Sequence, residues 1–452
     1  MQRPIYLDYA ATTPLDPAVL DAMLPYFGSP QASQSSLLTT NYSLPTILFG
    51  NPGSLHSFGQ QASGAVFTAR QMVAKELNCH YSEVIFTGSA TEANNLALRG
   101  AVAARRETAN NESRVKSRGS LATRHSRLAP RIIISAIEHE SILSTAKDLR
   151  REGVEVVIIP VSKTGVVDLK KFKAALNDQT VLVSVMFANN EIGAVQPITE
   201  IAELVRAFRS SRSTHYSLQT TNYPLLHTDA AQAFQYIECD VQKLGVDLLT
   251  LSAHKIYGPK GVGCLYVRRD PAAKLPTTHY SLRSIITGGG QEQGLRSGTE
   301  NVASVVGFAK AISLAAMNRE DESLRIAKLR NLTWQGIKKI FPKAVLNGPA
   351  SSTHYSLQTT NYPLRLPNNL NFYIPGVSGE QLLITLDLCG VAVSSGSACA
   401  ARSIDPSHVL LAMGHDSARA KNSIRISLGR PTTPQEMKRF LTILAKVKKN
   451  IS

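Results

Sequence analysis

The residue best suited to covalent chemistry is Lys255, in the segment LSAHKIYGPKGVG at residues 251–263. A lysine becomes a nucleophile or a Schiff-base partner near neutral pH only when burial or a neighbouring positive charge lowers its pKa. The apolar run at residues 246–251 predicts a buried strand that delivers Ser252, His254 and Lys255 to its carboxyl end. The alternative for this segment alone is a surface lysine in an ordinary glycine-rich loop.

Small residues follow a second predicted strand, at residues 83–87. The sequence GSATE at residues 88–92 leads from that strand into a predicted helix. Small residues let backbone N–H groups approach an anion, the N-terminus of a helix favours negative charge, and Thr91 adds a hydroxyl. The stretch around Ala90 and Thr91 therefore suits a phosphate. The alternative is an ordinary helix cap, with Ser89 or Thr91 as the N-cap residue.

Polar side chains follow two further predicted strands. His139 comes just after the strand at residues 131–135, and Asn190 comes just after the strand at residues 180–188. A histidine at this place can move protons or stack on a flat ligand, and an asparagine amide can donate to a carboxylate or phenolate oxygen. For His139 the alternative is a structural histidine with satisfied hydrogen bonds. For Asn190 the alternative is an ordinary turn, which asparagine and glycine favour.

A carboxylate, Asp229, ends the series after a predicted strand at residues 225–228. A carboxylate deep at a strand end needs a cationic partner, and a pyridinium N–H would be one, with Gln232 within reach of the same ring. The alternative is a helix N-cap aspartate. A phosphate cradle, an aspartate for a pyridinium nitrogen, a histidine to stack and a Schiff-base lysine, Lys255, together describe a pyridoxal 5′-phosphate site.

Three candidate residues lie beyond the lysine. Thr299 closes the glycine-rich stretch at residues 288–299, which can embrace a phosphate from the same or a neighbouring subunit. Cys399 lies among small residues in a predicted exposed loop, where a thiolate can react; the alternative is an inert loop cysteine. Arg425, on a short predicted strand, is a candidate bidentate clamp for a substrate carboxylate.

The elements that must position these residues alternate between strand and helix. Such alternation predicts a mainly parallel sheet with helices on both faces, and sites in such sheets lie at the carboxyl ends of the strands. The predicted strands are residues 83–87, 131–135, 154–160, 180–188, 225–228 and 246–251. The predicted helices are residues 17–27, 92–104, 141–151, 198–209 and 302–317.

The composition narrows the class of protein. A chain of 452 residues favours two domains. No apolar run approaches about 18 residues, and the N-terminus has no signal-peptide core, so we expect no membrane span and no secretion. Five cysteines without CxxC spacing argue against a disulfide framework or a zinc site and favour a reducing compartment, the cytoplasm.

The net charge of +16 raises the alternative of a non-catalytic basic module that binds RNA or other proteins. Residues 106–131 hold seven lysines and arginines against two glutamates. This segment lacks apolar periodicity, so it is interpreted as a disordered, solvated basic loop rather than a nucleic-acid site.

A repeat stands outside this pattern. THYSLQTTNYPL occupies residues 214–225 and again residues 353–364, and related fragments stand at residues 36–44 and 278–282. Irregular spacing excludes a solenoid. We interpret these copies as translated repetitive elements accepted in surface loops, where insertions cost little; the alternative is a repeated binding epitope. The predicted insertions lie near residues 33–46, 106–131, 213–225, 276–284 and 351–365.

Nine motifs together resemble the cysteine desulfurases of the NifS/IscS type, in the class V aminotransferase family. They are LDYAATTP at residues 7–14, GNPGSLHSFG at 50–59, TGSATEANNLA, EHESIL, NNEIGAVQPI, HTDAAQ, SAHKIYGPKGVG, GGGQEQGLRSGT and SSGSACAA. The resemblance implies the pyridoxal-phosphate transferase fold type I, with a seven-stranded, mainly parallel sheet in a large domain at residues 15–300. A smaller α+β domain would comprise residues 1–14 and 301–452 and carry the cysteine loop.

The resemblance implies how the cofactor would be held. Lys255 would carry pyridoxal 5′-phosphate as a Schiff base, Asp229 would pair with the pyridine nitrogen, Gln232 would pair with the ring hydroxyl oxygen, and His139 would stack on the ring and help move protons. The residues around the phosphate would be Ala90, Thr91, Ser252, His254 and, across a dimer interface, Thr299. Asn190 would contact both the cofactor and the substrate.

The resemblance also implies the reaction, in which sulfur leaves L-cysteine, L-alanine forms, and Cys399 becomes a persulfide. Asn190 and Arg425 would bind the substrate carboxylate, and Lys255 would take the Cα proton. The sulfur would pass to scaffold or acceptor proteins for iron–sulfur clusters or for thiolation, tRNA thiolation included, and Cys399 would be a transient iron–sulfur cluster ligand. A homodimer is expected. A class V aminotransferase and a selenocysteine lyase are the alternatives within the fold.

The chain departs from the resemblance at its C-terminus. It ends soon after Lys448 and Lys449, without the C-terminal tail that some IscS-type members use to dock a scaffold protein. Docking through such a tail is therefore in doubt.

Overall fold

The computed structural model describes residues 3–28, 48–116, 129–213, 223–269, 282–350, 364–395 and 405–451. The chain forms two compact units. Unit 1 comprises Met1–Thr13, Arg131–Glu238 and Asn318–Ser452, and unit 2 comprises Pro14–Pro130 and Cys239–Met317. Among the described residues, no helix combines the length and the apolar character that a membrane span requires.

Unit 1 contains four parallel strands, in the order β4-β3-β5-β6. Their bounds are β3 Arg131–Ser135, β4 Glu155–Ile159, β5 Thr180–Ser184 and β6 Leu225–Asp229. The register places Ile133 opposite Val157 of β4 and Val183 of β5. The three strands β3, β5 and β6 are buried along almost their whole length, as expected for parallel strands covered on both faces.

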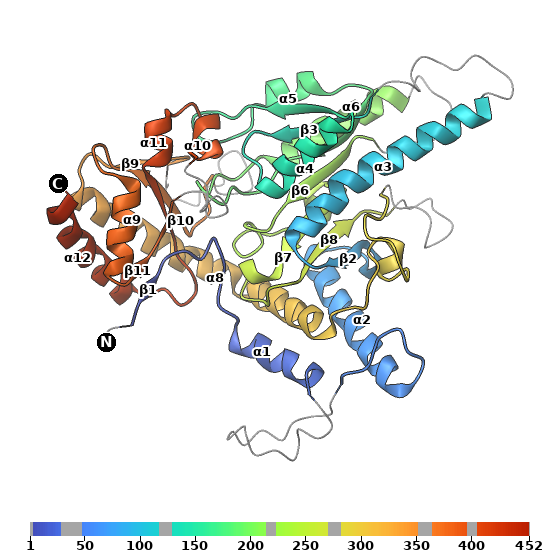
Figure 1. The fold of residues 1–452 in the computed structure, drawn as a ribbon, viewed down its shortest axis with the longest axis horizontal. Helices are drawn as coiled ribbons and strands as arrows, with labels where there is room; N and C mark the ends of the chain where they lie inside the picture. The colour runs from blue at the N-terminus through green and yellow to red at the C-terminus, as the bar shows by residue number, and fades with distance from the viewer. Residues whose placement is uncertain are drawn as a thin grey trace. The chain divides into compact units, whose positions relative to one another are not determined.

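Helices follow these strands in the alternation that the sequence predicts (Figure 1). They are α4 Glu140–Arg151 after β3, α5 Leu169–Ala175 after β4, and α6 Ile198–Ser213 after β5. Each strand of this set therefore delivers its carboxyl end to a loop or turn that holds a candidate residue or leads into a helix. The predicted mainly parallel α/β architecture is confirmed.

Unit 2 contains three strands, in the order β2-β8-β7. They are β2 Val84–Thr87, β8 Gly263–Val267 and β7 Leu248–Ser252, and β8 is antiparallel to both neighbours. No strand is predicted at β8, because Gly263 and the glycine- and proline-rich stretch before it favour a turn. Within this set, β8 runs antiparallel to both β2 and β7.

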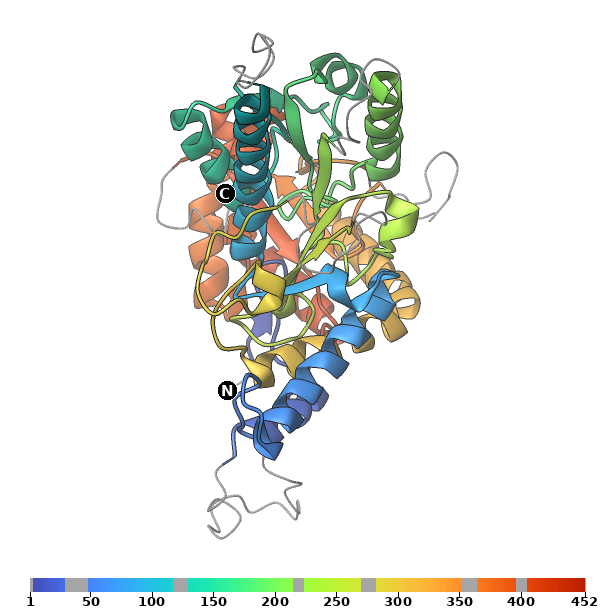
Figure 2. The same cartoon turned by 90° about the vertical axis from the view of Figure 1, so that its right-hand side faces the viewer.

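Three α-helices lie in the described N-terminal part of unit 2. They are α1 Pro17–Met23, α2 Ser57–Leu77 and α3 Ala90–Lys116. In Figure 2, α2 is the long blue helix. It buries Ala62, Val66, Ala69 and Val73 along one face. No helix is predicted at α2, because small and polar residues fill much of its sequence. Helix α8, Val302–Ile340, begins in unit 2 but continues far beyond the predicted end at residue 317, and its residues from Asn318 onward belong to unit 1.

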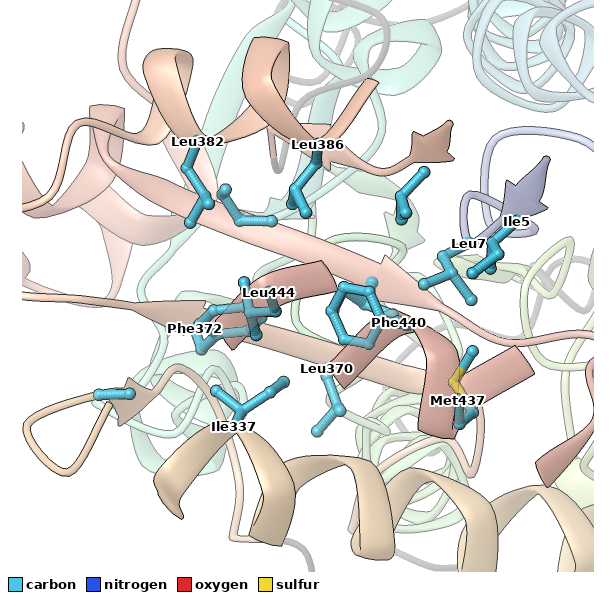
Figure 3. Close-up of a cluster of buried hydrophobic side chains, with 14 of the residues drawn as sticks. Ile5, Leu7, Ile337, Leu370, Phe372, Leu382, Leu386, Met437, Phe440 and Leu444 are labelled. Carbon is cyan, nitrogen blue, oxygen red and sulfur yellow. The ribbon is translucent and has the colours of Figure 1, made fainter. Parts of the chain in front are cut away.

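The C-terminal part of unit 1 has a separate core (Figure 3). Phe372 of β10 and Phe440 of α12 lie among Leu382, Leu444 and Ile337, and all five are nearly or completely buried. The strands around this core are β1 Ile5–Tyr6, β9 Val345–Leu346, β10 Asn369–Tyr373, β11 Val391–Ala392, β12 Ser394–Ser395 and β13 Ser423–Ser427. The helices are α9 Gly379–Leu388, α10 His408–Ala412, α11 Ser417–Lys421 and α12 Pro434–Ile451.

This core draws its buried members only from Ile5 and Leu7 and from residues 326–447. The predicted division into a small domain at residues 1–14 and 301–452 and a large domain at residues 15–300 stays a prediction. The first strand, β1, pairs in parallel with β11, so the N-terminus is tied to the C-terminal part of the chain.

The prediction of a disordered basic loop at residues 106–131 is wrong at both ends. Helix α3 continues to Lys116, and Arg131 is the first residue of β3, where its guanidinium donates to Glu155 at 2.9 and 2.6 Å. Glu107 on α3 pairs with Arg283. Residues 117–128 lie outside the described residues.

The bounds predicted for the repeat-containing insertions are also too wide. Leu225 begins β6, Leu282 is buried, and Arg365 is 3% exposed with its Nε donating to the carbonyl oxygen of Pro349 at 2.8 Å. These edge residues belong to the packed structure. The rest of these insertions falls in residues 29–47, 214–222, 270–281 and 351–363, which lie outside the described residues.

We predict that replacing residues 214–222 by a short glycine–serine linker leaves the melting temperature nearly unchanged, since loop length contributes little to stability. Extending the deletion through Pro224 should lower the melting temperature by several degrees, because the carbonyl oxygen of Pro224 accepts from Arg209 Nε at 3.0 Å. Thermal unfolding followed by circular dichroism compares the two variants. Equal destabilisation by both would contradict the insertion hypothesis.

Candidate active site

The predicted site residues fall into both units. Unit 2 holds Ala90, Thr91, Ser252, His254, Lys255 and Thr299. Unit 1 holds His139, Asn190, Asp229, Gln232 and Arg425. Cys399, with the rest of residues 396–404, lies outside the described residues.

The first turn of α3 follows β2 directly, as predicted. Ser89 Oγ accepts from the N–H of Glu92 at 3.1 Å, and the Glu92 carboxylate accepts from the N–H of Gly88 at 2.9 Å. The helix cap proposed as the alternative is therefore present and is made by Ser89. The cap leaves the N–H groups of Ala90 and Thr91, in the first helical turn, without an intrahelical acceptor. A cap and an anion site are compatible here.

Gly263 brings this turn close to the end of β7. On β8, Gly263 lies opposite Thr87 of β2 on one side and Ser252 of β7 on the other. A Cβ at Gly263 would lie 2.9 Å from the carbonyl carbon of Ser89 and 3.0 Å from the nitrogen of Ala90. Real side chains do not come so close to backbone atoms, so only glycine permits this approach of the α3 N-terminus.

Ser252 supplies a test of whether the residues fit a phosphate. Its side chain ends β7 and is 3% exposed, and within the part of the chain that the structure describes its Oγ has no hydrogen-bond partner. A buried hydroxyl without a partner is costly, so such groups are usually satisfied by a ligand or by water. A phosphate held by the α3 N-terminus beside Gly263 would satisfy it. The residues present therefore fit the phosphate of pyridoxal 5′-phosphate.

His254 and Lys255 lie in the short 3₁₀ turn Ala253–Lys255 that follows Ser252. Burial, with the charges of Lys255 and Lys260 as further causes, lowers the pKa of His254 to about 4. The imidazole is therefore neutral at pH 7 and can donate one N–H to an anion without carrying a charge. The predicted strand-end placement of Lys255 is found, and its side chain is partly buried.

The glycine-rich segment before Thr299 is tied to the start of α3. Arg296 Nε donates to Glu92 Oε1 at 2.8 Å, and Gln291 Oε1 accepts from the N–H of Gly298 at 2.9 Å. Thr299 itself is exposed. Its reach to a phosphate in a partner subunit stays a prediction.

In unit 1, Asp229 ends β6 and is 6% exposed. Its Oδ1 accepts from the N–H of Ala231 at 3.0 Å, and its carbonyl oxygen accepts from the N–H of Phe187 at 2.9 Å. These bonds hold the carboxylate at the strand end. Gln232 Nε2 donates to the carbonyl oxygen of Ala10 at 2.9 Å, which uses one of the two amide donors of Gln232.

His139 is both the N-cap of α4 and a candidate proton carrier. Its Nδ1 accepts from the N–H of Ser141 at 3.1 Å and lies 2.9 Å from Ser141 Oγ. When Nδ1 accepts from a backbone N–H, a neutral imidazole carries its proton on Nε2. The structural alternative is thus correct for one ring nitrogen, and the other stays suited to proton transfer.

Arg425 is 1% exposed on β13 and has an acidic partner that the sequence analysis does not identify. Its Nη2 donates to Asp8 Oδ1 at 2.7 Å, and its Nη1 donates to the carbonyl oxygen of Asn190 at 3.1 Å. The guanidinium of Arg425 is therefore oriented before any substrate binds. Asp8 belongs to the LDYAATTP motif, and that motif is the only sequence signal for it.

Glu138, next to His139, is a second residue that the sequence analysis misses. The carboxyl group is fully buried; its Oε1 accepts from Ser135 Oγ at 2.5 Å and from the N–H of Met186 at 2.8 Å. Burial raises the pKa of Glu138 to about 8, against those two hydrogen bonds, which lower it. Glu138 is therefore mostly protonated at pH 7.

Comparisons with known proteins identify the family of this chain. The family model described as Aminotransferase class-V matches residues 5–112 and 120–440. The chain is similar to the cysteine desulfurase IscS of Clostridium botulinum, with 39% identity over 99% of this chain and 95% of the relative. It is 41% identical to the mitosomal cysteine desulfurase of Trachipleistophora hominis, over 96% of this chain and 83% of the relative.

Two solved structures are similar over almost their entire lengths. A NifS-like protein superposes with a TM-score of 0.77 at 32% identity, covering 99% of this chain and 100% of the other. A structure titled SspA in complex with cysteine superposes with a TM-score of 0.69 at 30% identity, covering 94% of this chain and 98% of the other.

We predict that Glu138→Gln flattens the pH dependence of stability. A carboxyl whose folded pKa is raised stabilises the fold below its ordinary pKa of 4.5, and this contribution is lost as pH rises through about 8. Between pH 6 and pH 8 the free energy of unfolding of the wild type should therefore fall, relative to the variant, by about 2 kcal/mol.

Urea unfolding at both pH values measures this difference. The exposed Glu380→Gln is the matched control and should leave the pH dependence unchanged. Parallel pH profiles for the wild type and Glu138→Gln would contradict the raised pKa of Glu138.

Proposed function

Because this chain belongs to the class-V aminotransferase family, we propose that it is a pyridoxal-phosphate-dependent cysteine desulfurase. It removes sulfur from L-cysteine, releases L-alanine and retains the sulfur as a persulfide on Cys399. The observation that carries the cofactor assignment is the orphaned hydroxyl of Ser252 beside the α3 N-terminus. The reaction is supported by relatives named cysteine desulfurase that align with almost the whole chain.

We assign the phosphate of the cofactor to the donors of unit 2. The N–H groups of Ala90 and Thr91, the hydroxyl of Ser252 and the neutral imidazole of His254 supply hydrogen bonds, and the helix N-terminus favours the negative charge. Lys255, which follows directly, is the covalent attachment point. When bound, pyridoxal 5′-phosphate acts as an electron sink that stabilises negative charge at the substrate Cα.

The ring and the protons are assigned to other residues. Asp229 would keep the pyridine nitrogen protonated by accepting its N–H, Gln232 would donate its second amide N–H to the ring hydroxyl oxygen, and His139 would stack on the ring. Lys255 Nζ would accept the Cα proton, and His139 Nε2, which carries the proton of the neutral ring, would serve a further proton transfer. These roles are supported by the strand-end positions and by the cap bond that orients His139.

The substrate carboxylate is assigned to Arg425 and Asn190. Arg425 is held by Asp8 and by the Asn190 carbonyl oxygen, so its orientation costs little entropy when L-cysteine binds. The amide of Asn190, in the connection between β5 and α6, supplies a second donor toward the same carboxylate and a contact to the cofactor.

Cys399 is the sulfur acceptor in this proposal. Its thiolate attacks the sulfur of L-cysteine, an S–S bond forms, and the C–S bond of the substrate breaks with its electron pair remaining on carbon. That carbon then takes up a proton and becomes the methyl group of L-alanine. No external oxidant is needed, because the gain of a C–H bond balances the formation of the persulfide.

The persulfide then passes to an acceptor or scaffold protein for iron–sulfur clusters or thiolation. We propose a cytoplasmic homodimer, in which Thr299 contacts the phosphate of the partner subunit and Cys399 is a transient iron–sulfur cluster ligand. Large apolar side chains exposed on unit 2 support an interface there. They are Leu20, Leu24, Phe27, Phe49, Leu55 and Phe58, and Leu55 is 91% exposed.

The alternatives are not favoured. A general aminotransferase, a selenocysteine lyase and a non-catalytic RNA-binding module each lack support from the relatives above, which are named cysteine desulfurases. The intact series of Lys255, Asp229 and His139 at strand ends also argues against a non-catalytic role.

We predict that the wild type releases sulfide and alanine from L-cysteine in the presence of a reductant, and that Cys399→Ala loses at least about 100-fold in sulfide release. The variant should keep the visible absorbance of the bound cofactor, since Cys399 does not hold it. Lys255→Ala should lose both the sulfide release and the visible absorbance of the bound cofactor. Full sulfide release by Cys399→Ala would assign a different sulfur acceptor or a different reaction.

A further inference from the structure

The chain returns to the described structure at residue 405, and helix α10, His408–Ala412, begins shortly after. Ser407 is the N-cap of α10, is 5% exposed and accepts from the N–H of Leu410 at 3.2 Å. Ser407 follows Cys399 by eight positions in the sequence. Contacts made by Ser407 and His408 therefore fix the chain at the point where it re-enters the described structure, on the C-terminal side of Cys399.

The hydroxyl of Ser407 donates a hydrogen bond to the buried carboxyl group of Glu191. Ser407 Oγ donates to Glu191 Oε2 at 2.5 Å, and Glu191 is 2% exposed. The backbone of Glu191 is itself fixed, because its N–H donates to Asn189 Oδ1 at 2.9 Å and its carbonyl oxygen accepts from Asn371 Nδ2 at 3.1 Å. A short hydrogen bond to a rigid, buried carboxyl group is among the stronger polar contacts available to a hydroxyl.

The next residue, His408, contacts the loop that carries His139. His408 Nε2 lies 3.0 Å from the carbonyl oxygen of Glu138, and His408 Nδ1 lies 3.7 Å from Glu140 Oε1. Glu138 and Glu140 are the two neighbours of His139 in the chain. Ser407 and His408 therefore hold, respectively, the residue after Asn190 and the residues on both sides of His139.

Apolar packing completes the attachment. Val409 and Leu410 of α10 are buried in one cluster with Ile137, Met186 and Ile192. These three side chains flank the same two loops, so α10 is fixed against them by hydrophobic as well as polar contacts.

The charges around Glu191 connect this attachment to the substrate site. Burial raises the pKa of Glu191, while the Ser407 hydroxyl and the charges of His408 and Arg425 oppose that rise. Arg425 is the proposed clamp for the substrate carboxylate, and its Nη1 donates to the carbonyl oxygen of Asn190, one residue before Glu191. Glu191 thus lies between the anchored end of the cysteine segment and the substrate clamp.

We propose that Glu191 and Ser407 are positioning residues for sulfur transfer: their hydrogen bond anchors the cysteine-bearing segment to the loops of His139 and Asn190. The proposal rests on the proposed role of Cys399 as sulfur acceptor. Neither residue touches the reacting sulfur; each acts through the chain that leads to Cys399. Loss of the anchor should slow persulfide formation and leave cysteine binding unchanged, because misplacement of a nucleophile by about 1 Å costs on the order of 100-fold in rate.

The test measures single-turnover persulfide formation on Cys399 in the holoenzyme, by alkylation and mass spectrometry, together with the KM for L-cysteine. Ser407→Ala and Glu191→Ala should each slow persulfide formation by about 10- to 100-fold with KM within about twofold of the wild type. Glu191→Gln retains a side-chain acceptor and should recover most of the rate. The double variant should be no slower than the single ones, because both remove the same hydrogen bond.

Ser378→Ala is the matched control. Ser378 is the N-cap of α9 and accepts from the N–H of Gln381 at 3.3 Å, as Ser407 does from Leu410. Unlike Ser407, the Ser378 hydroxyl makes no hydrogen bond to a buried carboxyl group among the described contacts. This variant should lower the melting temperature slightly, through loss of a cap, and leave the rate of persulfide formation unchanged.

The outcomes distinguish failure of the proposed Glu191–Ser407 anchor from failure of the proposed role of Cys399 as sulfur acceptor. Normal persulfide formation in Ser407→Ala and Glu191→Ala, or an equal loss in Glu191→Gln and Glu191→Ala, would overturn the anchor while the wild-type reaction stands. A parallel rise in KM would assign Glu191 to substrate binding and overturn the positioning role. A wild type that forms no persulfide on Cys399 would overturn both proposals.

Discussion

The absence of a side chain at Gly263 is the constraint on which the cofactor half of the site depends. A single Cβ there would collide with the backbone of Ser89 and Ala90, and the first turn of α3 would move away from the end of β7. Ser252 lies opposite Gly263 in the sheet, and the turn that carries His254 and Lys255 follows Ser252 directly. The proposed phosphate site thus depends on backbone geometry rather than on a cluster of cations.

Unit 1 contains buried ionisable side chains, whose charge must be either paired or neutralised. Arg425 is almost completely enclosed and is balanced by Asp8, whereas burial raises the pKa of Glu138, so that its carboxyl group is neutralised by protonation. Burial also raises the pKa of Glu191, but the Ser407 hydroxyl and the charges of His408 and Arg425 oppose that rise. These buried groups fix the ends of β3, β5 and β13 relative to one another within the unit.

Sequence reasoning failed where an element's ends depend on packing. The basic segment after residue 106 lacks apolar periodicity, yet α3 continues to Lys116, and local propensity does not show where a helix of 27 residues stops. The edges of the repeats were misplaced for the same reason: Arg365 has the composition of a loop residue but is buried against the carbonyl oxygen of Pro349. The antiparallel β8 was missed because its glycine, which serves close packing, is typical of a turn.

The sequence by itself determined the alternation of strands and helices, the position of the candidate residues at strand ends, and the family, because apolar periodicity and short motifs are local properties of a chain. Only the tertiary structure decided which groups meet. Asp8 and Arg425 are separated by 417 positions, and Glu191 and Ser407 by 216, yet each pair is within hydrogen-bond distance. Such pairs leave no local pattern, since either residue alone is ordinary in its own segment and gains its role from a partner that folding brings to it.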